Sequence, residues 1–346
     1  MSLLDQFRKD TVLDLDANDD EAAVKYGPFG NMTSNQGIVL TELKKARHAE
    51  LIREGALQAL QDLKDGTEKD VSAAQLAVDW MTVKLGAQVI KHLASDGCVL
   101  AQTNPSLAYS TPETVEHARR FVRLYNRVDI PISRICIKVP STLEGLRACK
   151  ILGAEHGIQA LGTMVLSVEQ GIAAGEEAKC LNTSPYCNPL EVHFTPSTHV
   201  NYKDPVEEMP GMRMTAQIQR QFKRRGVKTK VLAASLITIE ETLSLSGVDR
   251  ATLGISMLEM MSTTQPNAAY EALRKKAIAS YDASFVAQDE IPTDVKFPLE
   301  EPATALKAAL ARPEVAEGMK NALRRFTEAE NECLGIAEKA LQAIKA

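Results

Sequence analysis

Residues 134–145, RICIKVPSTLEG, contain the unit on which the whole chain is built. The run from Arg134 to Val139 is short and apolar, as expected of a buried strand. Ser141-x-x-Glu144 follows directly with the spacing of a capping box, which predicts that a helix begins there. A buried strand that leads straight into a helix is typical of a parallel sheet.

The same strand and helix alternation recurs along the chain. Apolar residues at helical spacing separate the strand-like runs, and Gly157 and Gly226 are placed to end helices. Eight such units favour closure into an α/β fold of the (β/α)8 TIM-barrel type over an open sheet. A Rossmann fold is disfavoured because no G-x-G-x-x-G follows the first strand. The predicted strands are 11–16, 31–35, 97–103, 134–139, 158–164, 180–186, 230–235 and 251–256.

Three regions depart from this alternation. Residues 190–208 are rich in Pro, Thr, His and Asn and predict a long loop on the active face, and residues 289–302 form a proline-punctuated connector. Residues 303–346 predict two helices broken near Pro313. About 40 residues make a poor independent core, so we expect one barrel domain over 1–346 with residues 303–346 packed on it.

Composition narrows the classes of function. The 346 residues include 40 Lys and Arg against 45 Asp and Glu, a net charge of −5 that disfavours a nucleic-acid partner. No apolar run approaches the ~20 residues that span a bilayer, and the first ten residues lack a signal-peptide core. The six cysteines form no C-x-x-C pair, which argues against zinc and against a disulfide framework. We expect a cytoplasmic protein without a metal or membrane contact.

Lys138 is the first candidate for chemistry. Catalytic groups of such barrels lie at the carboxyl ends of strands, on side chains that point inward at alternate positions. If Ile135 and Ile137 face the outer helices, Lys138 enters the barrel, loses hydration and has a lowered pKa. Its neutral amine could then attack a carbonyl carbon to form a Schiff base. Spacing alone leaves open a strand-end lysine whose amine reaches solvent.

The same alternation collects polar side chains on the other strands, although strand ends are often polar simply because they meet water. Convergence of these polar side chains on Lys138 favours an active site. The members are Asp14 and Asp16, then Asn31, Thr33 and Asn35, then Gln102, then Thr163 on a face with Leu161, then Asn182, Ser184 and Tyr186, and finally Ser235.

Residues 135–145 resemble the Schiff-base signature of the transaldolase family, I-K-[ILV]-[AP]-S-T-W-[EQ]-G, whose members are class I aldolases on a (β/α)8 barrel. Similar stretches are RLYN (123–126), TSN (33–35), SPY (184–186), SGVDR (246–250) and AEGMK (316–320), so the resemblance covers nearly the whole chain. It implies that Lys138 is the Schiff-base lysine and Asp16 the first-strand aspartate, with Asp14 as the alternative. No cofactor is implied, because the lysine is itself the electron sink.

Further positions match the active site of the family: Thr33, Asn35, Thr163, Ser184 and Ser235. The likeness assigns proton transfer during imine formation to Asp16, and hydroxyl binding to Asn35 and Ser184.

Several positions depart from the family pattern. Its two phosphate-binding arginines are Pro189 and Ile237 here, and its substrate-binding asparagine two residues before Thr163 is Leu161. These changes remove the usual phosphate clamp, so we expect an unphosphorylated carbonyl substrate and a role in specialised metabolism.

The glutamate on the third strand is also replaced, by Gln102, which cannot act as a base near neutral pH. Gln102 together with Tyr186 resembles the fructose-6-phosphate aldolase branch, in which the tyrosine transfers the proton. This likeness assigns acid/base work to Tyr186, with Gln102 and Thr163 positioning water. The predicted reaction is aldol-type C–C cleavage or formation.

Three alternatives remain open. An ordinary transaldolase could transfer a dihydroxyacetone unit between sugar phosphates with a phosphate site moved to Lys203 or Arg213. The imine could instead serve dehydration, isomerisation or cyclisation, or the barrel could bind a metabolite without catalysis. His193 and His199 lie in the loop near the predicted site, where exposure is the commoner state of a histidine. A homodimer is compatible with the family.

Overall fold

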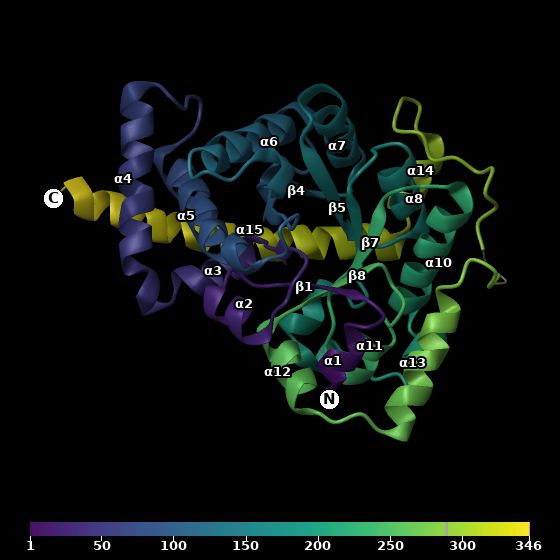
Figure 1. The fold of residues 1–346 in the computed structure, drawn as a ribbon. Helices are drawn as coiled ribbons and strands as arrows, with labels where there is room; N and C mark the ends of the chain where they lie inside the picture. The colour runs from purple at the N-terminus through teal and green to yellow at the C-terminus, as the bar shows by residue number, and fades with distance from the viewer. Residues whose placement is uncertain (288–289, 346) are drawn as a thin grey trace.

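The computed structural model describes residues 1–287 and 290–345. Eight parallel strands close into a barrel in which each strand pairs with its neighbours in sequence and β8 returns to β1 (Figure 1). This confirms the (β/α)8 prediction, and each predicted strand overlaps an observed one. The strands are β1 (Val12–Leu15), β2 (Met32–Thr33), β3 (Val99–Gln102), β4 (Ile135–Pro140), β5 (Gln159–Val165), β6 (Asn182–Pro185), β7 (Lys230–Ala233) and β8 (Arg250–Leu253).

Helices connect the strands around the outside of the barrel. Gly157 and Gly226 adopt left-handed φ values of 64° and 65° and end two of them, as predicted. The helices are α1 (Leu3–Phe7), α2 (Asp20–Tyr26), α3 (Gln36–Leu43), α4 (Ala49–Asp65), α5 (Ala73–Val89), α6 (Thr111–Asn126), α7 (Leu143–His156), α8 (Val168–Glu176), α9 (Pro205–Glu208), α10 (Pro210–Arg225), α11 (Ile239–Leu243), α12 (Ile255–Thr263), α13 (Ala268–Ser280), α14 (Thr304–Leu310) and α15 (Pro313–Lys345).

The predicted capping box at the start of α7 is wrong. Thr142, not Ser141, accepts the hydrogen bond from the first turn, which the backbone N–H of Gly145 donates at 2.9 Å. Ser141 lies just after β4, and its N–H donates to the Thr163 carbonyl on β5 at 2.8 Å. The strand therefore extends one residue further than the capping-box spacing allowed, and the cap moves with it.

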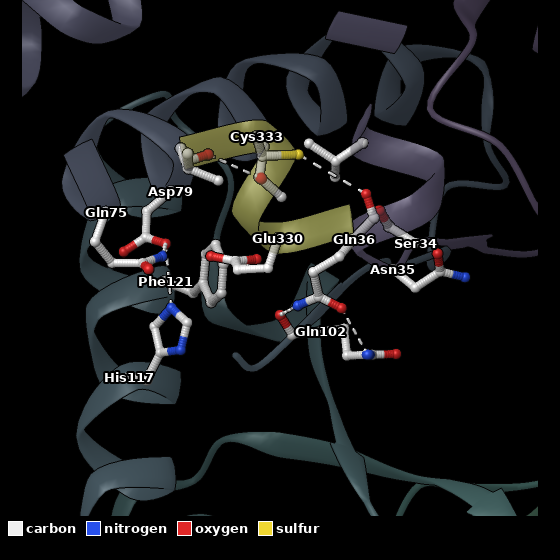
Figure 2. Close-up of a pocket in the computed structure, with 13 residues that line it drawn as sticks. Ser34, Asn35, Gln36, Gln75, Asp79, Gln102, His117, Phe121, Glu330 and Cys333 are labelled. Carbon is white, nitrogen blue, oxygen red and sulfur yellow. Dashed lines mark hydrogen bonds and ion pairs between the residues drawn. The ribbon is translucent and has the colours of Figure 1, made fainter. Parts of the chain in front are cut away.

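The carboxyl-terminal helices follow the predicted break, with α14 ending at Leu310 and α15 beginning at Pro313. In Figure 1, α15 is the long yellow helix that crosses the barrel, and it packs on α3, α4 and α5. Two of its side chains, Glu330 and Cys333, face a small internal cavity of about 10 Å³ that Gln36 and Gln102 also line (Figure 2).

The predicted long loop, residues 190–208, contains three short helical segments. They are the 3₁₀ helices η5 (Leu190–His193) and η6 (Pro196–Thr198), and then α9. In the predicted connector, residue 289 lies outside the described residues, and residues 290–302 contain neither helix nor strand.

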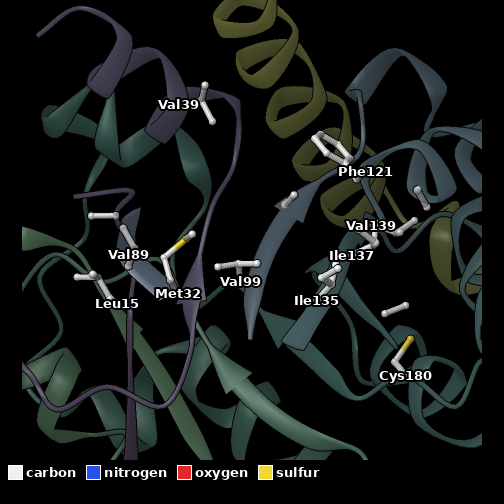
Figure 3. Close-up of a cluster of buried hydrophobic side chains, with 14 of the residues drawn as sticks. Leu15, Met32, Val39, Val89, Val99, Phe121, Ile135, Ile137, Val139 and Cys180 are labelled. Carbon is white, nitrogen blue, oxygen red and sulfur yellow. The ribbon is translucent and has the colours of Figure 1, made fainter. Parts of the chain in front are cut away.

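The core divides into layers according to the alternation of the strands. Ile135, Ile137 and Val139 of β4 lie together in the main apolar cluster between the barrel and its helices (Figure 3). Cys136, between them in sequence, packs inside the barrel with Leu100 and other apolar side chains. All six cysteines are buried free thiols. No helix in the described part of the chain is long and apolar enough to cross a membrane.

Candidate active site

Lys138 enters the barrel from β4, because it has the same parity as Cys136. It is 3% exposed, and its Cα pairs in register with Gln102 on β3 and Leu161 on β5. Within the described residues, its Nζ makes no hydrogen bond or ion pair. Burial lowers the pKa of the Lys138 amine, and the Asp16 carboxylate opposes that shift. The Lys138 side chain as a whole is therefore largely withdrawn from solvent.

The two first-strand aspartates lie at different depths. Asp14 is fully buried and accepts hydrogen bonds from the Arg250 guanidinium at 2.5 and 2.8 Å and from the Asn31 N–H at 2.7 Å. Asp16 lies beyond it, at the carboxyl end of β1, where the Thr33 hydroxyl donates to its Oδ1 at 2.5 Å. Asp14 is thus committed to an ion pair, whereas the Asp16 charge acts on Lys138.

The Thr33 hydroxyl is also 2.6 Å from the Thr252 hydroxyl on β8, a contact that the sequence analysis missed. Thr33 therefore holds Asp16 in place. Thr252 shares the parity of Arg250 on β8, and that alternation could have identified it as an inward-facing residue.

Gln102 is held by Gln36, the first residue of α3 and another residue that the sequence analysis missed. Gln36 Nε2 donates to the carbonyls of Gln102 at 3.4 Å and Thr103 at 3.1 Å, so its Oε1 is turned toward Gln102. Gln102 Nε2 donates to that Oε1 at 2.7 Å (Figure 2). Gln102 Oε1 has no hydrogen-bond partner among the described residues. This orientation makes Gln102 a hydrogen-bond acceptor for a ligand or a water.

Tyr186 and Thr163 meet at the top of the barrel, where the Thr163 hydroxyl donates to Tyr186 Oη at 3.3 Å. Burial raises the pKa of the Tyr186 phenol, and the hydrogen bond from Thr163 opposes that shift. The ring packs in an apolar cluster with Met164 and with Phe326 of α15. Tyr186 is therefore a protonated phenol at neutral pH, with its hydroxyl beside β5.

The surroundings of three further predicted site residues differ: these residues are Asn35, Ser184 and Leu161. Asn35 caps α3, and its Oδ1 accepts the Ile38 N–H at 3.0 Å, so its amide nitrogen remains for a ligand. Ser184 is buried on β6. Leu161 is fully buried and packs with Cys136 and Leu100, so the structure places it in the apolar interior of the barrel.

Ser235 lies near Pro189 and Ile237, the two positions at which the phosphate-binding arginines of the family are replaced. Ser235 follows β7 in a left-handed conformation with φ of 69°. The Ile237 N–H donates to the buried carboxylate of Glu241 at 2.7 Å, and Pro189 immediately precedes η5. The last residue of η5, His193, places Nε2 2.9 Å from Ser235 Oγ. The His193 side chain is exposed, as the sequence analysis expected of a loop histidine, but its contact with Ser235 was missed because no local pattern gives the path of η5.

The described residues form a cleft beside Tyr186 but no metal centre. Within the described residues, no group of His, Cys, Asp and Glu side chains is arranged to hold a metal ion. Tyr186, Leu190, Tyr202 and Arg213 are among the residues that line a cleft of about 980 Å³, whereas Lys138, Asp16 and Gln102 are not among them.

Comparisons with known proteins agree with this geometry. Residues 4–297 match the family model described as transaldolase/fructose-6-phosphate aldolase. The chain is 31% identical over 282 residues to "Transaldolase B" of Pasteurella multocida, which covers 81% of this chain and 84% of that protein. It is 30% identical over 257 residues to "Transaldolase" of Saccharomyces cerevisiae, covering 74% of each chain. A "Transaldolase" of Synechocystis is 27% identical over 344 residues, or 99% of this chain and 82% of that protein. The chain therefore belongs to the transaldolase/fructose-6-phosphate aldolase family.

Proposed function

We propose that the protein is a Schiff-base aldolase that cleaves or forms a C–C bond in an unphosphorylated carbonyl compound. The observation that carries the proposal is the Lys138 amine, which is buried at the carboxyl end of β4 with its pKa lowered by burial. A neutral amine attacks the carbonyl carbon, loss of water gives an iminium, and the iminium accepts the electron pair of the C–C bond that breaks.

Asp16 carries the proton transfers of imine formation. Its charge acts on Lys138, and the Thr33 hydroxyl fixes one of its oxygens. Asp14 does not serve this role, because Arg250 and Asn31 occupy its carboxylate.

Tyr186 supplies the proton to the aldol oxygen. A phenol whose pKa is raised by burial stays protonated, which suits the bond-forming direction, where an alkoxide must be protonated. Gln102 Oε1 and the Thr163 hydroxyl position a water beside it. The pair of Gln102 and Tyr186 supports a proposed kinship with the fructose-6-phosphate aldolase branch of the family.

The substrate lacks a phosphate, because Pro189 and Ile237 offer no cationic donor at the positions where family members carry arginine. Asn35 Nδ2 and the Ser184 hydroxyl bind hydroxyl groups of the carbonyl donor. We place this reaction in specialised metabolism of the cytosol, carried out by one barrel domain over 1–346.

Product analysis tests the proposal directly. The protein is incubated with ¹³C-labelled dihydroxyacetone and unphosphorylated aldehydes, and products are followed by NMR. We expect a new ¹³C–¹³C or ¹³C–¹²C bond in the wild-type protein and none in Lys138→Met. Products that have lost water without a new C–C bond would assign the imine to dehydration, and phosphorylated acceptors used more efficiently would indicate an ordinary transaldolase.

A further inference from the structure

The loop that carries His193 is fixed on both sides. The Glu191 carboxylate in η5 accepts hydrogen bonds from Arg325 of α15 at 2.5 and 3.0 Å, and from the Thr195 hydroxyl at 2.8 Å. The Arg325 guanidinium also lies 4.6 Å from the centroid of the Phe194 ring. His193 is thus flanked by two residues that α15 holds in place, which gives its imidazole a defined position.

Ser235, the partner of His193, is held as firmly. Its carbonyl accepts two hydrogen bonds from Asn188, from the backbone N–H at 3.1 Å and from the side-chain amide at 3.0 Å. The same amide donates to Glu241 at 2.9 Å. A serine in the left-handed region is strained, and such strain persists where the surroundings fix it, often at ligand sites.

Partial burial, and not the surrounding charge, favours a neutral His193 imidazole. Burial lowers the pKa of His193, Asp16 and Glu241 oppose that shift, and the His199 imidazole adds to it. Glu241 is already occupied by two backbone N–H groups of the β7–α11 loop, by Asn188, and by His199 at 2.6 Å. These groups, two carboxylates and one imidazole, include no lysine or arginine.

A neutral imidazole and a serine hydroxyl each donate and accept hydrogen bonds. A substrate hydroxyl also does both, so it matches this pair. A phosphate dianion only accepts hydrogen bonds and is bound best by cationic donors such as arginine. His193 reaches Ser235 beside Pro189 and Ile237, where family members carry those arginines.

We propose that His193 and Ser235 form the subsite for the far end of the substrate and select an uncharged hydroxyl over a phosphate. The inference rests on the proposed function, since it assumes a carbonyl compound bound to Lys138. His193 is a specificity-determining residue. The substrate class that this subsite selects is a polyhydroxylated carbonyl compound without phosphate.

The test uses D-fructose and D-fructose 6-phosphate, which differ only in the phosphate. Borohydride reduction traps each on Lys138, and the trapping rate is measured against ligand concentration for the wild type, His193→Asn, His193→Arg and His156→Asn. His156 ends α7 and serves as the matched control. We expect His193→Asn to raise the half-saturating concentration of fructose and leave the maximum rate unchanged.

His193→Arg should shift the preference toward fructose 6-phosphate by about tenfold or more, the range of one charge-assisted hydrogen bond. In the wild type the preference should also move toward the phosphate once the pH falls far enough below the ordinary histidine pKa of 6.5 to protonate His193, whose pKa is lowered. His193→Asn should lose that additional shift, and His156→Asn should behave as the wild type.

The possible failures are distinguishable. If Lys138 is trapped but neither His193 variant changes the preference or its pH dependence, the subsite is refuted while the Schiff-base proposal survives. If no carbonyl compound is trapped on Lys138 of the folded wild-type protein, both proposals fall. Preference of the wild type for fructose 6-phosphate at pH 7.5 would also overturn the subsite.

Discussion

Replacement of Glu330 by glutamine should make the protein more stable at alkaline pH. Glu330 lies on α15 at 5% exposure, with Oε1 lacking a hydrogen-bond partner among the described residues. Burial raises the pKa of its carboxyl to about 7 from an ordinary 4.5, Asp79 adds to the shift, and Gln75 opposes it. The shift corresponds to about 3 kcal/mol at 1.36 kcal/mol per pKa unit.

The sign follows from proton linkage. The folded protein keeps this proton up to about pH 7, whereas the unfolded chain releases it near pH 4.5. The stabilising contribution of the neutral carboxyl is therefore complete below about pH 4.5 and is lost as the pH rises through about 7. Glu330→Gln is neutral throughout and escapes this loss.

Urea unfolding at pH 4.5 and pH 8.5 measures the effect. The free energy of unfolding of Glu330→Gln, relative to wild type, should be about 3 kcal/mol more favourable at pH 8.5 than at pH 4.5. The control is Glu338→Gln, an exposed position on the same helix, which should show no such difference. Equal effects of Glu330→Gln at the two pH values would refute the reasoning.

Three further predictions concern the site. Lys138→Met should abolish borohydride trapping yet leave the melting temperature unchanged or raised, since a buried amine is removed; a trapped adduct in this variant, found by peptide mass mapping, would contradict the assignment. Tyr186→Phe should lower kcat by roughly 10²-fold or more while trapping on Lys138 persists, because only the later proton transfer is lost; unchanged kcat would assign that proton elsewhere. Gln36→Leu removes the hydrogen bond that orients the Gln102 amide, so kcat should fall about tenfold while the half-saturating concentration changes less. The control is Thr41→Val on the exposed side of α3. An equal fall of kcat in both variants would show that Gln36 has only a structural role.

The sequence could predict the site residues that lie on the strands. Alternation along β4 sends Ile135 and Ile137 outward and Lys138 inward, because successive strand residues point to opposite faces. The same rule brought Asp16 and Gln102 to the carboxyl end of the barrel, where parallel strands converge.

The alternation of strand residues could not identify site residues that lie in loops or at the starts of helices. Gln36 reaches Gln102 only because α3 follows β2, which lies beside β3 in the barrel. His193 reaches Ser235 only because α15 fixes η5 through Glu191. Contacts over more than 40 residues of sequence depend on tertiary packing, which no local spacing records. The misplaced capping box had a similar cause, since Ser141 is held by a hydrogen bond to β5.

The most direct measurement of the central claim is borohydride reduction in the presence of unphosphorylated hydroxyketones, followed by proteolysis and peptide mass mapping. The account predicts a single reduced adduct on Lys138, formed at neutral pH and absent in Lys138→Met. A folded protein that binds these compounds without any adduct, or with its adduct on another lysine, would contradict it.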